Sequence, residues 1–206
     1  DLPGHGRSPG PARETIGGIS DWIAEFIEAA GLERVALVGH SMGSLAALET
    51  AIRREHRVTK LALIGTAVPM AVSEPFLAAA RDNSPAAFDM ETVWGHARGA
   101  MLAQSPVPGM ALVSASRALN GRAHPGVLHA CLKACQAYAP SIESIRALPM
   151  PTLVLAGRRD QMTPAKFGKA LAAEIPGARF ELIDAGHSMM QEAPHESLRA
   201  LRSFLD

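Results

Sequence analysis

The sequence has few cysteines, few aromatic residues, no net charge and no long hydrophobic run. Twenty basic residues balance twenty acidic ones among its 206 residues, so the formal charge is zero. That balance argues against a surface for nucleic acid or anionic lipid, because such a surface needs a basic excess. No apolar stretch approaches the length of a membrane span, and none resembles a secretory signal. We therefore expect neither a nucleic acid nor a membrane as partner.

The cysteines indicate the cellular compartment, and the aromatic and methionine content indicates which side chains would line a pocket. Cys131 and Cys135 are the only cysteines, and their spacing puts both on one face of a helix without matching a zinc or redox pattern. We interpret them as small buried thiols in a reducing compartment, which favours a cytoplasmic location. Aromatic residues make up only 4% of the chain, so a pocket would be lined mainly by aliphatic and thioether side chains. The candidate methionines for such a lining are Met70, Met90, Met101 and Met110.

Helix-like and strand-like patterns alternate in the first third of the chain. Apolar residues recur at helical spacing from Ile19 to Ala30, and Gly31 supplies a helix stop. The run "RVALVG" (34–39) indicates a short buried strand, a helix is expected over 44–54, and "VTKLALIG" (58–65) indicates a second strand. This alternation is typical of βαβ units in a parallel sheet.

The alternation stops at Pro69 and resumes near Leu148. Between them lie short Ala- and Met-rich helical pieces broken by prolines, with no strand pattern. The later elements are expected to be strands at 151–157 and 178–184 and helices at 164–175 and from Pro194 onward. We therefore predict an α/β core made of residues 1–68 and 147–206, interrupted by an all-helical cap over 69–146.

The sharpest motif is Gly39-His40-Ser41-Met42-Gly43, which lies between the predicted strand 34–39 and the following helix. In a strand-to-helix turn, the pattern G-x-S-x-G forms an elbow that presents its serine hydroxyl. The turn is so tight that the serine takes an unfavourable φ and both glycines must be small. Ser41 is therefore the candidate nucleophile at the carboxyl edge of the sheet.

A serine hydroxyl becomes a good nucleophile only when a base removes its proton and a third group orients that base. Asp160 follows the predicted strand 151–157, and His187 follows the last predicted strand. The order Ser, Asp, His along the chain is the order found in α/β-hydrolases. Asp184 is the alternative acid, but it lies only three residues before His187 and would have to swing back to orient it. We therefore favour Asp160.

On these motifs the sequence resembles an α/β-hydrolase-fold serine hydrolase of the esterase or lipase-like kind, with a helical cap. The resemblance implies a mostly parallel sheet flanked by helices and a catalytic triad of Ser41, His187 and Asp160. It also implies that the backbone N–H of Met42 helps to hold the oxyanion. No metal and no organic cofactor are implied.

The sequence indicates less about the roles of the remaining histidines. His40 fills the variable position of the elbow and is expected to pack or to face solvent. His5 lies in a loop that the resembled family places near the active-site mouth, so a contact with substrate stays open beside an ordinary surface position. Five others match no metal-ligand spacing and are expected to be solvated or locally hydrogen-bonded: His56, His96, His124, His129 and His195.

The resemblance leaves several reactions open. It implies hydrolysis of a carboxylic ester, or a related acyl bond, of a small and largely apolar substrate through an acyl-enzyme intermediate. Carbon–carbon bond hydrolysis of ring-cleavage products, cofactor-free perhydrolysis and thioester hydrolysis are alternatives on the same three residues. A nucleophilic serine argues against the dehalogenase and epoxide-hydrolase branches. A non-catalytic binder of a small ligand is the alternative from another class, and the oligomeric state stays open.

The opening stretch, "DLPGHGRSPG", is rich in glycine and proline and resembles a loop that leaves a strand. In the resembled family, the matching segment follows the fourth strand. We therefore expect an N-terminal part of the sheet ahead of Asp1 to be missing, together with the loop that usually supplies the second oxyanion donor. On that expectation the strand 34–39 has an unpaired edge, and the chain is a poorly active or inactive fragment.

Overall fold

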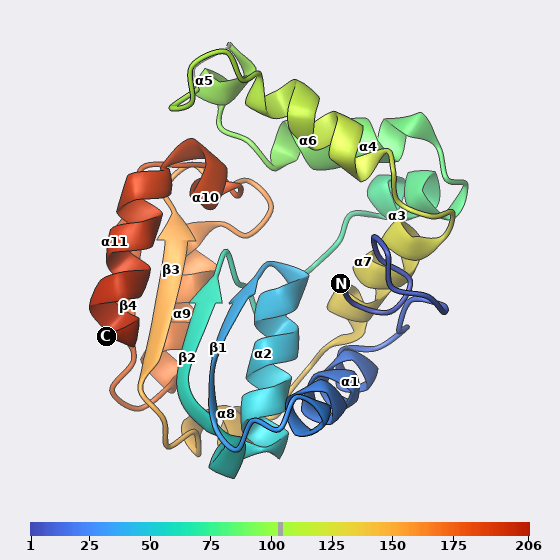
Figure 1. The fold of residues 1–206 in the computed structure, drawn as a ribbon. Coiled ribbons are helices and arrows are strands. Elements are labelled where there is room, and N and C mark those ends of the chain that lie inside the picture. Colours follow the sequence, from blue (N-terminus) through green and yellow to red (C-terminus); the bar gives the residue numbers. More distant parts are fainter. Residues whose placement is uncertain (103–104) are drawn as a thin grey trace.

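The computed structural model describes residues 1–102 and 105–206. Its centre is a parallel sheet flanked by helices, and a group of short helices lies across the carboxyl ends of the strands (Figure 1). The strands are β1 (Val35–His40), β2 (Val58–Ile64), β3 (Thr152–Gly157) and β4 (Arg179–Ile183). In the described residues they pair in that order, each parallel to the next. The predicted α/β class with a parallel sheet is thus confirmed.

Four long helices flank the sheet, close to where their apolar periodicity predicts them. The four long helices are α1 (Ile16–Ala29), α2 (Met42–Arg53), α9 (Ala165–Glu174) and α11 (Pro194–Leu205). The core also contains two short helical segments, η1 (Glu55–Arg57) and α10 (Met189–Glu192). The hydroxyl of Thr15 caps α1 by accepting the N–H of Gly18 at 3.0 Å, and the helix buries Ile16 and Ile19. The short segments η1 and α10 have no counterpart in the sequence predictions.

The segment between β2 and β3 is entirely helical in its described residues. Its helices are α3 (Glu74–Arg81), α4 (Pro85–Trp94), α5 (Arg98–Met101), α6 (Leu112–Asn120), α7 (Val127–Ala137) and α8 (Ile142–Arg146). Figure 1 shows α3, α4, α5 and α6 above the sheet, whereas α7 lies lower, beside α2. Helix α8 differs, because its Ile145 is 3% exposed and packs into the core cluster. Helix α8 thus packs on the core, and the boundary of the cap at residue 146 stays a prediction.

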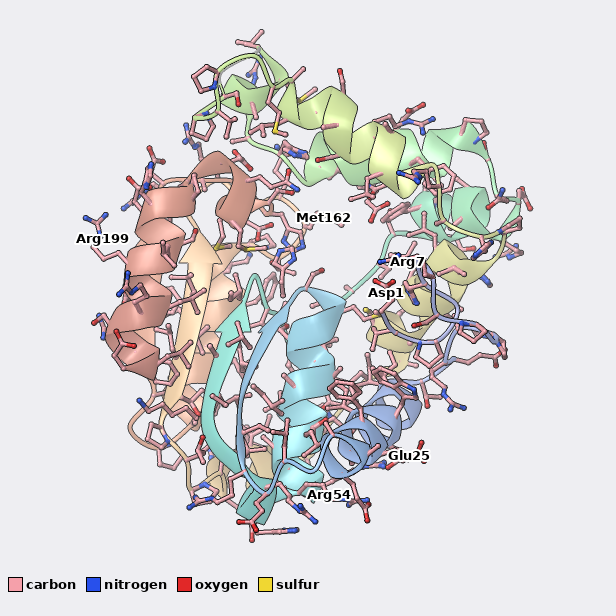
Figure 2. All side chains as sticks on the ribbon, in the orientation of Figure 1. Asp1, Arg7, Glu25, Arg54, Met162 and Arg199 are labelled. Atoms are coloured by element: carbon pink, nitrogen blue, oxygen red, sulfur yellow. The ribbon has the colours of Figure 1, made fainter. Side chains whose placement is uncertain are left out.

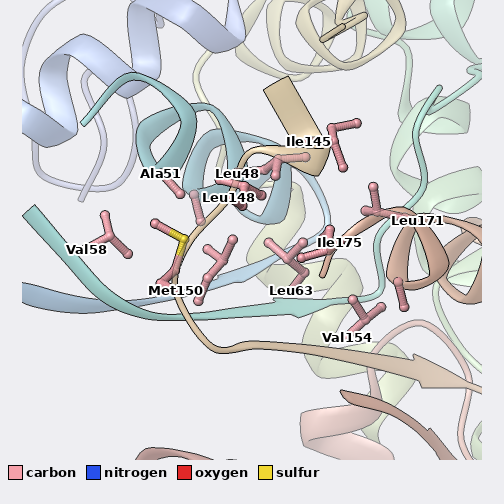
Figure 3. Close-up of a cluster of buried hydrophobic side chains, with 13 residues drawn as sticks. Leu48, Ala51, Val58, Leu63, Ile145, Leu148, Met150, Val154, Leu171 and Ile175 are labelled. Atoms are coloured by element: carbon pink, nitrogen blue, oxygen red, sulfur yellow. The ribbon is translucent and has the colours of Figure 1, made fainter. Parts of the chain in front are cut away.

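The main hydrophobic cluster packs β2 and β3 against helices on one face of the sheet (Figure 3). Leu48 of α2, Leu63 of β2 and Val154 of β3 meet there without exposed surface. Close packing of this kind resists displacement, so it holds the carboxyl ends of the strands in fixed positions. In the described part of the chain, no helix has the length and apolarity needed to cross a membrane.

Candidate active site

The serine of the elbow occupies a strained backbone position between β1 and α2. Ser41 has φ 54° and ψ −124°, a region that residues other than glycine rarely adopt. Its N–H donates to the carbonyl of Ile64 at 2.9 Å, and its own carbonyl accepts the N–H of Ser44 at 2.8 Å. These bonds hold the turn from the neighbouring strand and from the first turn of the helix. The Ser41 side chain is thereby presented at the carboxyl edge of the sheet.

The elbow needs glycine at position 39 because strand and helix approach each other closely there, whereas a Cβ at Gly43 would meet no atom within 4 Å, so the expectation that both glycines must be small holds for Gly39 alone. A Cβ atom at Gly39 would collide with the backbone of Gly43. Met42 is the first residue of α2, so its N–H has no acceptor within the helix. An N–H at that position can hold a negatively charged oxygen bound to Ser41.

Asp160 and His187 meet at the neighbouring strand ends, as part of a buried hydrogen-bonded group. His187 Nδ1 donates to Asp160 Oδ2 at 2.8 Å, and the Thr163 hydroxyl donates to the same oxygen at 2.7 Å. The other carboxylate oxygen accepts the backbone N–H groups of Met162 and Thr163 at 2.9 and 2.8 Å. Asp160 is 6% exposed and His187 4%.

This arrangement keeps the carboxylate ionised. Burial alone would raise the pKa of Asp160, but the hydrogen bond and charge of His187, together with the bonds from Thr163, bring that pKa below its usual value. An ionised Asp160 fixes the imidazole tautomer, because Nδ1 then carries the proton and Nε2 is left as the base. Gly65, at φ +54°, lies against this ring, and a Cβ there would stand 3.1 Å from Nδ1.

Ser41 and His187 are less closely associated than Asp160 and His187. His187 Nε2 is buried and, among the described residues, has no hydrogen-bond partner, so the Ser41 hydroxyl does not bond to it. Both side chains lie at the carboxyl edge of one parallel sheet. Hydrogen bonds to a catalytic base are often long without substrate and shorten when substrate binds. The structure thus joins Asp160 to His187 by a hydrogen bond but shows no hydrogen bond between His187 and Ser41.

Asp184, the alternative acid, is turned away from the imidazole. Its side chain is 70% exposed and its carboxylate lies 3.3 Å from Arg159. His187 forms its carboxylate contact with Asp160 instead. The geometry therefore favours Asp160 for the orienting role.

His40 is a close neighbour of the site that sequence reasoning left undefined. Its ring centroid lies 4.6 Å from that of His187, and its Nε2 donates to the backbone carbonyl of His187 at 2.9 Å. Burial, and then the charge of His187, lower the pKa of His40 to about 4. His40 is therefore neutral near pH 7 and acts as a fixed donor to the His187 loop. It packs rather than faces solvent, which is one of the two predicted outcomes.

Several polar contacts join the cap to the segment around His187, and the sequence carried no signal for them. The carboxylate of Glu192 in α10 accepts the N–H of Gly186 at 3.2 Å and the N–H of Ala97, in the cap, at 3.1 Å. Nearby, the Ser116 hydroxyl donates to Gln191 at 3.0 Å and lies 3.2 Å from His96 Nε2. The cap is thus tied to residues on both sides of His187.

His5 lies beside Cys131 at the boundary between the opening loop and the cap. Its Nε2 is 3.3 Å from the Cys131 sulfur, and its Nδ1 donates to the carbonyl of Pro3 at 3.0 Å. Burial, and then the charge of Glu91, raise the pKa of Cys131 to about 11, so the thiol keeps its proton and donates to His5. Cys131 and Cys135 are both free thiols, and burial raises the pKa of Cys135 to about 12.

The predicted methionine lining is only partly supported. Met90 packs against the hydrophobic cluster of the cap, and Met70 is buried beside α1 and α2. Met101 and Met110 expose 44% and 47% of their surface, which does not support a pocket-lining role. Met162 of the Asp160 loop, which sequence reasoning did not select, lies between core and cap (Figure 2) and packs against the cap cluster. Within residues 1–102 and 105–206, no group of side chains is arranged to hold a metal ion.

The sequence pattern of the alpha/beta hydrolase fold matches residues 1–194. A pimeloyl-[acyl-carrier protein] methyl ester esterase of Methylococcus capsulatus is 31% identical over 95% of this chain and 75% of that protein. A 2-hydroxymuconate semialdehyde hydrolase of Pseudomonas putida is 28% identical over all of this chain and 75% of that protein. The crystal structure of an enol-lactonase from Burkholderia xenovorans LB400 superposes with a TM-score of 0.89 at 25% identity, over all of this chain and 78% of that one.

Proposed function

The chain belongs to the alpha/beta hydrolase family, and on that premise we propose that it cleaves a carboxylic ester of a small, largely apolar substrate through a serine-bound acyl intermediate. Its relatives are hydrolases, which supports hydrolysis as its general chemistry. Three points go beyond this general chemistry and are our proposal: the ester substrate, the catalytic triad and the acyl intermediate. The observation that carries them is the buried Asp160–His187 pair, whose free Nε2 lies at the same sheet edge as the strained Ser41.

In the proposed reaction, His187 Nε2 removes the Ser41 proton as the hydroxyl oxygen attacks the acyl carbonyl. Asp160 stays ionised and stabilises the imidazolium that forms. The carbonyl oxygen becomes an oxyanion that the N–H of Met42 can hold at the start of α2. The imidazolium then gives its proton to the leaving alkoxide, and a water activated by His187 releases the acid and frees Ser41.

The substrate space lies under the cap. The apolar cluster of α3, α4 and α7, with Met162 from the Asp160 loop, supplies aliphatic and aromatic surface above the site. A pocket with apolar walls and few polar groups suits a small apolar acyl or alcohol part. The two protonated thiols support a reducing compartment, and we place the protein in the cytoplasm on that ground.

Covalent labelling tests the nucleophile directly. The purified chain is treated with a fluorophosphonate, and its intact mass is recorded together with its hydrolysis of p-nitrophenyl butyrate. We expect one adduct and measurable turnover, with both lost in Ser41→Ala and in His187→Ala, since the serine and its base act as a unit. Ser114→Ala, on the exposed side of α6, is the matched control and should keep both. An adduct that persists in Ser41→Ala would disprove the assignment of the nucleophile.

Carbon–carbon bond hydrolysis is the second candidate, and its support is the likeness to the P. putida hydrolase. The same Ser41 and His187 would serve it, so the labelling experiment does not separate the two. The two reactions are separated by comparing kcat/KM on a vinylogous ring-cleavage diketone with kcat/KM on p-nitrophenyl butyrate. A ratio in favour of the diketone would replace the ester proposal with this one.

A further inference from the structure

Thr163 lies in the loop between β3 and α9, three residues after Asp160, and sequence reasoning did not select it. It is 2% exposed. Its backbone N–H donates to Asp160 Oδ1 at 2.8 Å, and its hydroxyl donates to Oδ2 at 2.7 Å. A single residue thus holds both oxygens of the carboxylate that orients the candidate base.

The two carboxylate oxygens of Asp160 are held by different kinds of donor. Oδ1 accepts backbone N–H groups, from Met162 and Thr163, which a change of side chain at these positions does not remove. In the described part of the chain, Oδ2 accepts side-chain donors alone, namely the Thr163 hydroxyl and His187 Nδ1. Without the hydroxyl, Oδ2 would be held by the same imidazole that it has to orient. The hydroxyl is therefore the independent anchor of this oxygen.

The hydroxyl oxygen of Thr163 also faces the imidazole of His187, at 3.1 Å from Nδ1. Because the hydroxyl proton is directed at Asp160, this oxygen presents a lone pair to Nδ1. Nδ1 thus lies between two oxygen acceptors, and the tautomer that carries its proton on Nδ1 fits this place. That tautomer leaves Nε2 free to accept a proton. All three residues are buried, so the loss of the hydroxyl would not be made good by bulk water.

We propose that Thr163 is a positioning residue whose hydroxyl fixes Asp160 Oδ2 and the His187 ring in the orientation that makes Nε2 the base. The inference rests on the proposed ester hydrolase function and adds a side chain that acts through the Asp160–His187 pair. The hydroxyl also takes up part of the negative charge on Oδ2, so it limits how strongly the carboxylate stabilises the imidazolium. Its removal should therefore change both the placement of the base and the pH range in which the base is neutral.

Two further titratable groups act on His187, and substitution of Thr163 leaves both in place. His40 of the elbow lies with its ring centroid 4.6 Å from that of His187, and the charge of Glu91 in α4 is coupled to the same imidazole. A change in pH dependence that follows substitution at position 163 is thus assigned to the Asp160–His187 pair.

The pH dependence of hydrolysis tests the proposal. The dependence of kcat/KM on pH is recorded with p-nitrophenyl butyrate for the wild type, for Thr163→Val, which replaces the hydroxyl by a methyl group, and for Thr163→Ser, which keeps the hydroxyl. In Thr163→Val we expect kcat to fall about 10-fold with little change in KM, because the base is misplaced in the transition state. We also expect the acid limb of the profile to move to higher pH by about half a unit, since a carboxylate with one donor fewer stabilises the imidazolium more. Thr163→Ser should match the wild type in both.

Thr152→Val is the matched control for the loss of a buried hydroxyl. Thr152 is 1% exposed, and its hydroxyl donates to the carbonyl of Met150 at 3.1 Å, at the start of β3 and away from Asp160. It should lower the Tm but leave kcat and the acid limb unchanged. The same outcome for Thr163→Val would show a purely structural role and overturn the proposal. If Thr163→Val does not fold, Thr163→Ala is measured in its place.

A measurement without substrate keeps this inference separate from the proposed function. The proton on His187 Nδ1 is observed by NMR in protein labelled with 15N-histidine and is assigned by its loss in His187→Ala. We expect a resolved signal in the wild type, Thr163→Ser and Thr152→Val, and a signal broadened by exchange in Thr163→Val. If no ester is cleaved but this difference appears, the hydrolase proposal fails and the positioning role stands. A signal that is absent from the wild type, or equal in the wild type and Thr163→Val, would overturn the positioning role.

Discussion

At the scale of single residues, Glu91 of α4 makes the stability of the fold depend on pH. Burial raises the pKa of its carboxyl to about 7, above the value of 4.5 for an unperturbed glutamate, so the folded chain holds this proton more tightly than the unfolded chain. The stabilising effect of that proton is complete below pH 4.5 and is lost as the pH rises to about 7. His187 and Cys131 are the titratable groups coupled to it.

Glu91→Gln should therefore stabilise the protein in a pH-dependent way. At pH 8.5 we expect its free energy of unfolding to exceed that of the wild type by about 2 kcal/mol, which allows for partial screening by solvent. At pH 4.5 the two should differ little, because the wild-type carboxyl is then protonated in the folded state and half protonated in the unfolded state. Urea unfolding at the two pH values measures the difference, with Glu74→Gln, at an exposed position of the cap, as control. Equal differences at both pH values would contradict the assigned pKa.

The residues that sequence reasoning selected differ from those it missed in the kind of signal that they carry. Ser41, Asp160 and His187 stand at strand ends within motifs, so their common edge follows from the parallel order of the strands. Their catalytic roles stay predictions. The places of His40 and Glu91 depend on how the His187 loop and the cap pack together, and no local pattern encodes such a contact.

At the scale of elements, the four-residue helix α10 connects the cap to the candidate base. The two carboxylate oxygens of Glu192 each accept one backbone N–H, one before His187 and one in the cap. Glu192→Gln replaces one acceptor by an amide that faces an N–H donor, so the His187 loop should lose its fixed position. We expect kcat to fall about 10-fold with little change in KM, because misplacement of the base affects the transition state.

The control for this experiment is Glu196→Gln, an exposed position in the first turn of α11. It should keep the wild-type kcat. A Glu192→Gln variant with a lower Tm and an unchanged kcat would show that Glu192 supports the fold without positioning the base.

Helices and strands were predictable where their apolar periodicity extends over enough residues to be recognised. The four strands and the helices α1, α2, α9 and α11 carry apolar repeats over five residues or more, and each was expected close to its observed place. Helix α10 spans four residues, too few to show a helical period. The core packing of Ile145 in α8 was equally hidden, because it looks like any apolar residue of a short helix until its packing partner is known.

At the scale of the whole molecule, β1 lies at one edge of the sheet that the described residues form. Its sequence is apolar, and Val38 is 46% exposed. An open edge with apolar side chains pairs readily with another strand. We therefore expect these 206 residues to self-associate in a concentration-dependent way, and Val38→Lys to shift the equilibrium toward the monomer by placing a charge on that edge.

Sedimentation velocity over a hundredfold range of protein concentration measures this equilibrium. Leu198→Lys in α11 is the matched control, since Leu198 is 54% exposed but lies on a helix, whose backbone groups are already paired. If hydrophobic surface alone drove association, both lysine variants would weaken it equally. If the strand edge drives it, Val38→Lys weakens it and Leu198→Lys does not, whereas a monomer at all concentrations in the wild type would disprove the role of the edge.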